Sequence, residues 1–335
     1  MIIPVRLNQS SYDIYLERGC LQRAGELLDL DRRVLIVTDE GVPASYAKAV
    51  AEKSADPHIE TVPAGEASKS FEMLQKILSR MLALRFSRKD CVVAVGGGVP
   101  GDLAGLAAAV YMRGIDFYNI PTTVLSQVDS SIGGKTAIDL DGIKNIVGAF
   151  YQPKRVLIDP DVLGTLPKRQ ISNGLAEAVK MSLTSDVGLF TLFEKDDPLN
   201  HIDEIIERSL RIKAAVVEAD EKESGLRRVL NFGHTIGHGI EAYEGLHGLY
   251  HGECVALGMI PMCSGPVRSR LIPVLKKLDL PVSCPVDDAR VCEAIAHDKK
   301  AADDMVTAVR VDEPGSFRFC QLAIPEIKDL IGVIS

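Results

Sequence analysis

Four of the seven histidines lie in one short segment of the chain, between residues 234 and 251. His234 and His238 are four residues apart, so on a helix they would share one face, one turn apart. His251 follows a glycine-containing segment that could fold the chain back toward them. Neutral imidazole is the commonest metal ligand, and a catalytic divalent ion typically takes three protein ligands. The spacing therefore indicates a metal site, with polar histidines at helix ends and in loops as the alternative.

A carboxylate earlier in the chain could complete this site. Apolar residues recur at helical spacing from residue 171 to residue 181, which predicts a helix that contains Glu177 and Lys180. The small residues around this pair favour a closely packed helix, where a charge needs a partner or a metal. A solvated ion pair on a surface helix is the alternative. Two imidazoles and one carboxylate, from His234, His251 and Glu177, would suit zinc.

A glycine-rich turn follows the apolar run 91–95, with glycines at positions 96, 97, 98 and 101. Glycines let backbone amides close on a phosphate, and a helix N-terminus favours the phosphate's negative charge. A tight turn that needs positive φ is the alternative explanation. Asp39, just beyond the apolar run 34–37, is well placed to bond a ribose hydroxyl. Pro100 suits a first helical turn but has no amide proton to donate.

Two further segments carry polar groups on loops near a predicted sheet edge. Thr122 and Thr123 end an apolar run, and the segment 128–136 contains an acid, two glycines and a lysine. Lys144 and Asn145 follow. Solvated surface charges are the alternative for each lysine, although a lysine flanked by glycines and β-branched residues fits that explanation less well.

Composition and charge narrow the class of protein. A hydrophobic content of 46% and a charged content of 25% are ordinary for a globular protein, and 335 residues fit two domains. The net charge of -8 disfavours nucleic acid and anionic membranes as partners. Seven cysteines without a C-x-x-C pair argue against a disulfide framework and a thiolate zinc site. No signal peptide and no membrane span is recognisable, so we expect a cytoplasmic protein.

Short apolar runs alternate with helical patterns in the first half of the chain, which predicts a Rossmann-like α/β domain with a mostly parallel sheet at residues 1–167. Long helical patterns follow, and they predict an all-α domain at residues 168–335. The cleft between two such domains is the natural place for a ligand. The expected strands are residues 2–7, 12–16, 34–37, 59–62, 91–95, 117–120 and 156–159.

With these residues identified, the chain resembles the 3-dehydroquinate synthase family of the sugar-phosphate cyclase superfamily. The matching segments occur in family order: GGGVPGDLAG (96–105), RGIDFYNIPTT (113–123), VDSSIGGKTAID (128–139), GIKNIVGAFYQP (142–153), GLAEAVK (174–180), LNFGHTIGHGIE (230–241) and HGECVALGM (251–259). The resemblance implies a dehydroquinate synthase-like fold and a homodimer in which Arg113 reaches the neighbouring subunit's site.

The resemblance also implies a set of site residues. It assigns the metal, usually zinc with cobalt able to substitute, to Glu177, His234 and His251. The NAD contacts that it implies are Asp39, Glu66, Lys69, Gly97, Gly98, Val99, Gly101, Asp102, Thr122, Thr123, Lys135 and Lys144. The substrate and catalytic residues that it implies are Asp129, Lys135, Asn145, Lys180, Lys213, Arg227, Asn231, His238 and either Lys299 or Lys300.

Members of this family convert 3-deoxy-D-arabino-heptulosonate 7-phosphate to 3-dehydroquinate and phosphate. NAD is transiently reduced, phosphate is eliminated, the hydride returns, and an intramolecular aldol reaction closes the ring. Lys213 and Arg227 would grip the carboxylate, and His238 would carry a proton or serve as a structural helix histidine. Glu253 would either orient His251 or face solvent.

Three departures from the family pattern stand out. Pro100 replaces the usual aliphatic residue, the segment 263–281 is shorter, and the usual glycine is missing after Lys300. Two other enzymatic functions remain as alternatives, that of a related sugar-phosphate cyclase and that of a metal-dependent NAD polyol dehydrogenase. A non-catalytic sensor that keeps the pocket is a third alternative.

Overall fold

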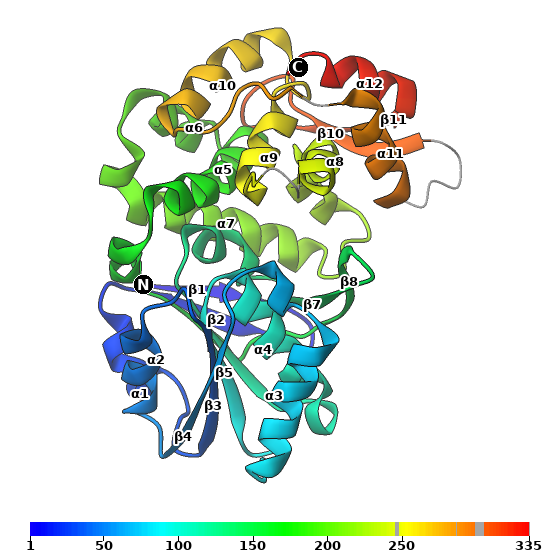
Figure 1. Ribbon diagram of the computed structural model, residues 1–335. Helices are drawn as coiled ribbons and strands as arrows, with labels where there is room; N and C mark the ends of the chain where they lie inside the picture. Colours follow the sequence, from blue (N-terminus) through cyan, green and yellow to red (C-terminus); the bar gives the residue numbers. More distant parts are fainter. Residues whose placement is uncertain (245–247, 286, 299–304, 335) are drawn as a thin grey trace. The chain divides into compact units, whose positions relative to one another are not determined.

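The computed structural model describes residues 1–244, 248–285, 287–298 and 305–334 (Figure 1). Lys299 and Lys300 lie outside the described residues. The chain divides into two compact units. Unit 1 comprises Met1–Leu166 together with Lys213–Glu221, and unit 2 comprises Pro167–Ile212 and Lys222–Ser335. Helix α7 (Ile202–Ala219) therefore contributes its first part to unit 2 and its last part to unit 1.

Unit 1 contains a seven-stranded sheet in the order β1-β2-β9-β6-β5-β3-β4. The first two strands form an antiparallel hairpin, and every other pairing in this sheet is parallel. This arrangement confirms the predicted mostly parallel sheet. The strands are β1 (Ile2–Val5), β2 (Tyr12–Leu16), β3 (Arg33–Asp39), β4 (Asp56–Val62), β5 (Cys91–Gly96), β6 (Asp116–Pro121) and β9 (Arg155–Ile158).

Alternate residues of the central strands pack against helices on opposite faces, as the period of a strand requires. Leu35 and Val92 belong to the core that contains helices α3 (Phe71–Ala83) and α4 (Gly98–Val110). Val34 and Val93 belong to the core on the other face, with α1 (Ala24–Leu27) and α2 (Ala44–Ala51). The sheet is therefore doubly wound, with both faces covered. Short helical turns complete the unit: η1 (Cys20–Arg23), η2 (Glu66–Ser68), η3 (Tyr111–Arg113), the π-helical η4 (Ser126–Ser130) and η5 (Pro160–Thr165).

A second, two-stranded sheet in unit 1 was not among the predicted elements. Strands β7 (Lys135–Leu140) and β8 (Ile143–Phe150) form an antiparallel hairpin. Most of β8 is exposed, so its sequence carries no buried apolar face to reveal it. The hairpin approaches α4 closely, since a Cβ at Gly105 would lie 2.4 Å from Thr136 Cγ2. Two segments predicted to carry site residues thus become the two strands of one hairpin.

Unit 2 is built mainly from helices, as predicted, but it also contains a small antiparallel sheet. The prediction of an all-α domain is wrong in this detail, because the apolar alternation of residues 305–310 is too short to separate a strand from a helix end by pattern. The elements are α5 (Lys168–Ser185), α6 (Val187–Lys195), η6 (Pro198–His201), η7 (Leu226–Asn231), α8 (His234–Glu244), α9 (His251–Met259), α10 (Gly265–Lys277), α11 (Asp288–Asp298), β10 (Met305–Arg310), β11 (Arg318–Ala323) and α12 (Ile324–Ile331).

Helices α5, α8 and α9 pack through glycines that bring their backbones together. A Cβ at Gly258 of α9 would lie 2.0 Å from the carbonyl oxygen of Gly233, just before α8. A Cβ at Gly252 would lie 2.0 Å from the carbonyl oxygen of Asn173 on α5. Any side chain at these glycines would separate the helices. Across the described residues, no helix combines the length and apolar character needed to cross a membrane.

Candidate functional site

The turn between β5 and α4 offers backbone amides at the start of a helix. Among the described glycines, those at 96, 97, 98 and 101 are absent from the set with positive φ, so the tight-turn explanation is wrong. Helix α4 begins after Gly97, and no side chain caps it. A Cβ at Gly96 would lie 2.5 Å from Pro100 Cγ, which shows that the proline ring fits because residue 96 is glycine. The turn keeps the form expected of a phosphate-binding helix N-terminus.

A cluster of charged side chains lies beside this turn. Lys69 is 4% exposed, and its Nζ lies 2.7 Å from Asp102 Oδ2 and 3.3 Å from Glu66 Oε1. The same ammonium donates a hydrogen bond to Asn145 Oδ1 on β8. Burial raises the pKa of Asp102 to about 6, against the opposing effect of Lys69. The family resemblance assigns Asn145 to substrate binding and Lys69 to NAD binding, and the structure places these two side chains in contact.

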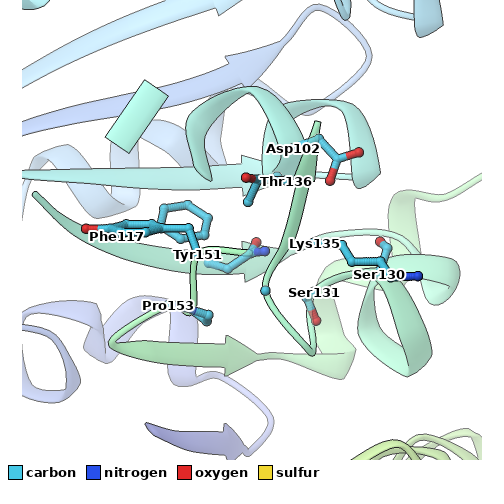
Figure 2. Close-up of a pocket in the computed structure, with 11 residues that line it drawn as sticks. Asp102, Phe117, Ser130, Ser131, Lys135, Thr136, Tyr151 and Pro153 are labelled. Atoms are coloured by element: carbon cyan, nitrogen blue, oxygen red, sulfur yellow. The ribbon is translucent and has the colours of Figure 1, made fainter. Parts of the chain in front are cut away.

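Unit 1 contains a small pocket with a volume of about 10 Å³. Figure 2 shows the side chains that line it. Asp102 and Lys135 both line it, so the structure brings these two predicted site residues to one place. Lys135 begins β7 directly after Gly133 and Gly134, both of which adopt left-handed backbone conformations. A Cβ at Gly134 would lie 2.6 Å from the terminal amide of Gln152, which would have to move, and the positive φ of 67° also favours glycine at this position.

Other predicted residues of unit 1 lie at strand ends and turns. Asp39 ends β3, and its Oδ1 accepts a hydrogen bond of 2.8 Å from the Gly41 amide. Thr122 is buried after β6, and the Thr123 hydroxyl lies 2.8 Å from Ser126 Oγ. Lys144 and Arg113 are exposed, and Arg113 has a positive φ of 67°.

A buried lysine on α7 contacts the π-helical turn η4. Lys213 is 6% exposed, and its ammonium pairs with the Asp129 carboxylate. Both residues belong to unit 1. Two further predicted residues belong to unit 2, where Arg227 is 1% exposed and Asn231 Nδ2 donates a 2.8 Å hydrogen bond to Glu223 Oε1. Glu223 was not predicted, and it follows no pattern that would distinguish it from a surface acid.

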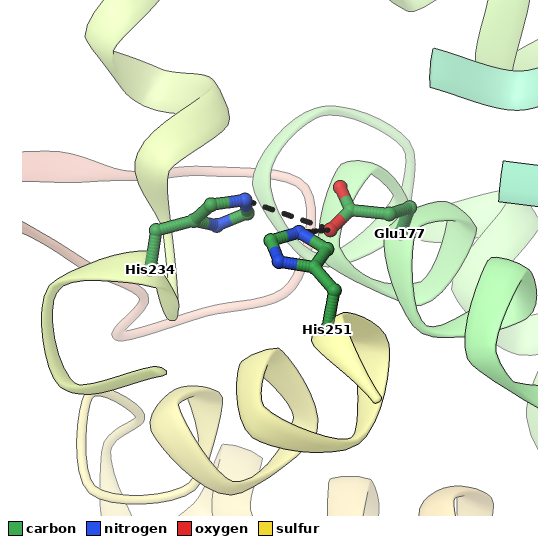
Figure 3. A group of neighbouring side chains, drawn as sticks. All are labelled: Glu177, His234 and His251. Carbon is green, nitrogen blue, oxygen red and sulfur yellow. Dashed lines mark ion pairs between the residues drawn. The ribbon is translucent and has the colours of Figure 1, made fainter. Parts of the chain in front are cut away.

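Three side chains from three helices of unit 2 converge in Figure 3. Glu177 lies on α5, and His234 and His251 are the first residues of α8 and α9. Glu177 Oε1 lies 3.5 Å from His234 Nε2 and 3.3 Å from His251 Nε2. Ligand atoms about 2.0–2.1 Å from a tetrahedral zinc ion lie roughly 3.3 Å from one another. Both distances from the carboxylate oxygen are therefore those expected between two ligands of one divalent cation, and all three ligand atoms lie within 4.8 Å of one another.

The second nitrogen of each imidazole also has a partner. His234 Nδ1 lies 3.1 Å from the Phe232 carbonyl oxygen, and His251 Nδ1 lies 3.1 Å from Glu241 Oε2. A protonated Nδ1 that donates to these oxygens leaves the Nε2 lone pair for a metal. Glu241 is seven residues after His234, a spacing that places it on the same helix face and could have identified it.

Of the two predicted roles of Glu253, the solvent-facing one is wrong. Its carboxylate pairs with Arg169 Nε at 2.7 Å and accepts a hydrogen bond from the Tyr250 amide. It is 6% exposed, so it does not face solvent. Residues two apart on a helix point in different directions, so any support that Glu253 gives to His251 would pass through the backbone rather than through the imidazole.

The charges at this site suit a cation. Glu177 has no exposed surface, and burial acts against its charge, but Lys180 and the two imidazoles hold its pKa well below the usual range. Burial lowers the pKa of His234, which keeps it neutral. For His251, burial is outweighed by Glu177 and Glu241, which raise its pKa to about 10, so a metal ion would bind Nε2 in exchange for a proton. Glu177 Oε2 pairs with Lys180, whereas Oε1 lies toward both imidazoles, so Oε1 is the oxygen that can face a metal.

A second set of possible ligands, His238, Glu241 and His251, shares one histidine with the first. His238 is exposed, and its ring centre lies 5.1 Å from that of His234. The contact between Glu241 and His251 uses Nδ1, which is the orienting nitrogen in the first set. The buried carboxylate of Glu177 therefore makes the first set the stronger candidate for a metal site, and His238 lies beside it.

A doubly wound unit followed by a mainly helical unit is a fold that this chain shares with sugar-phosphate cyclases. The structure of 2-deoxy-scyllo-inosose synthase complexed with carbaglucose-6-phosphate, NAD+ and Co2+ superposes with a TM-score of 0.89, at 26% identity and 99% coverage of both chains. The 2-epi-5-epi-valiolone synthase ValA from Streptomyces hygroscopicus subsp. jinggangensis 5008, with NAD+ and Zn2+ bound, gives a TM-score of 0.88 at 28% identity, with 98% of both chains covered.

Sequence comparison specifies the family further. The N-terminal domain family of 3-dehydroquinate synthase matches residues 59–173, and the C-terminal domain family matches residues 174–301. The 3-dehydroquinate synthase of Enterococcus faecalis (strain ATCC 700802 / V583) is 41% identical over 98% of each chain. The chain belongs to the 3-dehydroquinate synthase family.

Proposed function

We propose that this protein is an enzyme that converts 3-deoxy-D-arabino-heptulosonate 7-phosphate to 3-dehydroquinate and phosphate, a step of the shikimate pathway toward aromatic amino acids. The observation that carries the proposal is the convergence of Glu177, His234 and His251 in a chain that belongs to this family. A relative named for the same activity is similar over nearly its whole length.

The proposed cofactors are one divalent metal ion, zinc or cobalt, and NAD. Two structural neighbours contain NAD+ together with Co2+ or Zn2+. The buried, ionised carboxylate and the two oriented imidazoles fit the metal, and the uncapped start of α4 fits the pyrophosphate of NAD. When bound, the metal supplies Lewis acidity at an alcohol oxygen and NAD supplies reversible hydride transfer.

The chain's own residues would bind and orient the substrate. Lys213 and Arg227 would hold the carboxylate, because buried cations bind anions strongly where water is excluded. Asp129, paired with Lys213, would fix the direction of that ammonium. His238, exposed beside the metal ligands, would move a proton at the reacting hydroxyl. The phosphate would be held by Lys135, Asn145 and Asn231, with a lysine at 299 or 300 and Arg113 of the partner subunit.

The proposed NAD contacts lie along the strand ends and turns of unit 1. Asp39 would bond a ribose hydroxyl, and Lys69 with Asp102 would flank the start of α4. Thr122, Thr123, Glu66 and Lys144 complete the proposed set. We further propose a cytoplasmic homodimer, with residues 1–167 as the NAD-binding domain and residues 168–335 as the metal- and substrate-binding domain. The role of Arg113 in the neighbouring subunit would make the dimer necessary for activity.

The experiment that tests this proposal measures phosphate release and NADH together. Purified protein is mixed with the heptulosonate phosphate, zinc and less than one equivalent of NAD per substrate. We expect many equivalents of phosphate per NAD and no accumulation of NADH, because the cofactor is regenerated in each turnover. NADH formed in step with substrate consumption would instead indicate a polyol dehydrogenase. Binding without any turnover would indicate a sensor.

A further inference from the structure

Helix α5 carries a row of three polar side chains on one face. Arg169, Asn173 and Glu177 follow one another at a spacing of four residues, which places them one turn apart along the helix. Glu177 belongs to the candidate metal site. The other two side chains contact the beginning of α9, where His251 lies. All three side chains of the row therefore contact residues at the start of α9.

Asn173 fixes the closest approach of the two helices. Its side chain is 6% exposed, and its Oδ1 accepts a hydrogen bond of 2.6 Å from the amide of Gly252. A Cβ at Gly252 would lie 2.0 Å from the Asn173 carbonyl oxygen, so the two backbones are in direct contact. Gly252 is the residue after His251. The contact thus fixes the backbone of the metal ligand's immediate neighbour.

Arg169 contacts the chain both before and after the proposed metal ligand His251. Its Nε and Nη2 donate hydrogen bonds of 2.7 and 2.8 Å to the two carboxylate oxygens of Glu253, and Nη2 also donates to the Gly248 carbonyl oxygen at 2.6 Å. Its guanidinium lies 4.0 Å from the centre of the Tyr250 ring. Glu253 in turn accepts the Tyr250 amide at 2.8 Å. Residues 248, 250 and 253 are therefore all tied to α5 around His251.

We propose that Arg169 and Asn173 are positioning residues that set the affinity of the metal site by fixing His251 opposite Glu177. Metal–ligand distances must hold within about 0.2 Å, so a small displacement of α9 against α5 would weaken one bond to the ion. The described hydrogen bonds of both residues to the start of α9 go to backbone atoms and to Glu253 rather than to the imidazole of His251, so their effect passes through the backbone of α9. This inference rests on the metal assignment in the proposed function.

The first test removes the acceptor at position 173 without changing the size of the side chain. Asn173→Leu should weaken zinc binding about 10- to 100-fold, the range found for groups that support a metal ligand. Affinity is measured by competition with a chromogenic chelator on the full chain. Asn173→Asp, which keeps an oxygen facing the Gly252 amide, should stay within about threefold of the parent. Arg169→Met tests the second contact at a half-exposed position where loss of folding is not expected, and it should also weaken binding.

A control distinguishes positioning from a general loss of stability. Lys277→Met removes three hydrogen bonds to the carbonyl oxygens of Phe193, Glu194 and Asp196 in the same unit. It should lower the unfolding temperature and leave the zinc affinity unchanged. In the cobalt-loaded protein, Asn173→Leu should shift the visible absorption bands, whereas Lys277→Met should not.

One outcome would contradict the positioning role of Arg169 and Asn173, and another would contradict the metal assignment. Unchanged zinc affinity and cobalt spectrum in folded Asn173→Leu and Arg169→Met would show that the row only stabilises the fold. Absence of zinc binding by the parent protein would instead contradict the metal assignment itself.

Discussion

Glu177 combines complete burial with a strongly favoured negative charge. Desolvation alone would raise its pKa, yet Lys180 and two imidazoles hold the carboxylate ionised. Lys180 is itself 1% exposed, so the ion pair is buried on both sides. A buried pair of this kind contributes little net stability compared with apolar residues of the same size. Its presence is better explained by the chemistry that an ionised carboxylate allows.

Replacing the Glu177 carboxylate by an amide removes its negative charge while keeping the size of the side chain. In Glu177→Gln we expect metal affinity to fall more than about 100-fold, because a neutral amide binds a divalent cation much more weakly than an ionised carboxylate does. Breaking the buried pair with Lys180 should also destabilise the protein by about 3 kcal/mol. Metal content after dialysis and urea unfolding measure the two effects. Glu194→Gln, at an ion pair with Arg270, is the control and should change neither.

The Asp102 carboxylate gives a prediction about pH. Its folded pKa of about 6 is above the ordinary value of 3.8, so ionisation costs the folded state free energy. Its contribution to stability is complete below the unfolded pKa and is lost as pH rises through 6. A displacement of this size corresponds to roughly 3 kcal/mol, and solvent at the exposed fifth of the side chain reduces it to about 1–2 kcal/mol.

The Asp102→Asn variant carries no titrating group at this position. Its free energy of unfolding, relative to that of the parent, should therefore increase between pH 4 and pH 7 by about 1–2 kcal/mol. Urea unfolding at several pH values measures this difference. A difference that stays constant over the range would show that burial does not raise the pKa of Asp102.

Individual site residues could be predicted where their spacing along one helix places them on the same face. His234 and His238 share a face of α8, as the interval of four residues requires. The partner of His251 was not predicted, because Glu253 is nearer in sequence while Glu241 is nearer in space. The contact of Asn173 with Gly252 depends on how two helices pack, and no local pattern contains that information.

At the scale of elements, the turn from β5 to α4 depends on one close contact. Pro100 is buried in the first turn of α4, and its ring occupies the space beside Gly96 that a side chain would need. A proline at this place costs no helical hydrogen bond, because the first amides of a helix have no partner within it. The departure from the family pattern is thus accommodated by the glycine of β5.

A double-mutant cycle tests this contact. Gly96→Ala should destabilise the parent by about 1–3 kcal/mol, because the new methyl group meets the proline ring. In a Pro100→Ala background the same substitution should cost at least about 1 kcal/mol less. Urea unfolding of the four proteins measures the coupling. Additive effects would show that the ring is not what excludes a side chain at position 96.

The strands and long helices could be predicted because their apolar positions repeat with a clear period. The buried strand at 91–95 and the helix predicted around residues 171–181 both occur within a few residues of the predicted bounds. The β7–β8 hairpin was missed because its second strand is mostly exposed. The β10–β11 sheet was missed because its strands are short and follow a long helical region.

At the scale of the whole molecule, the distribution of positive charge is informative. The net charge is -8, yet four basic side chains are buried among the described residues, namely Lys69, Lys180, Lys213 and Arg227. All four are residues that the family resemblance assigns to cofactor or substrate. The three lysines each pair with an acid, Asp102, Glu177 and Asp129. Buried cations are rare without a functional reason, so their burial supports the proposal that these residues bind the anionic cofactor and substrate.

The central claim is that one divalent ion, held by Glu177, His234 and His251, is required for turnover. Metal-free protein, prepared with a chelator and dialysed, is titrated with zinc while bound metal and phosphate release are both measured. The rate should be negligible at the start, rise in proportion to bound zinc, and level off at one ion per chain. Full phosphate release by verified metal-free protein, or a rate that is independent of bound zinc, would contradict the claim.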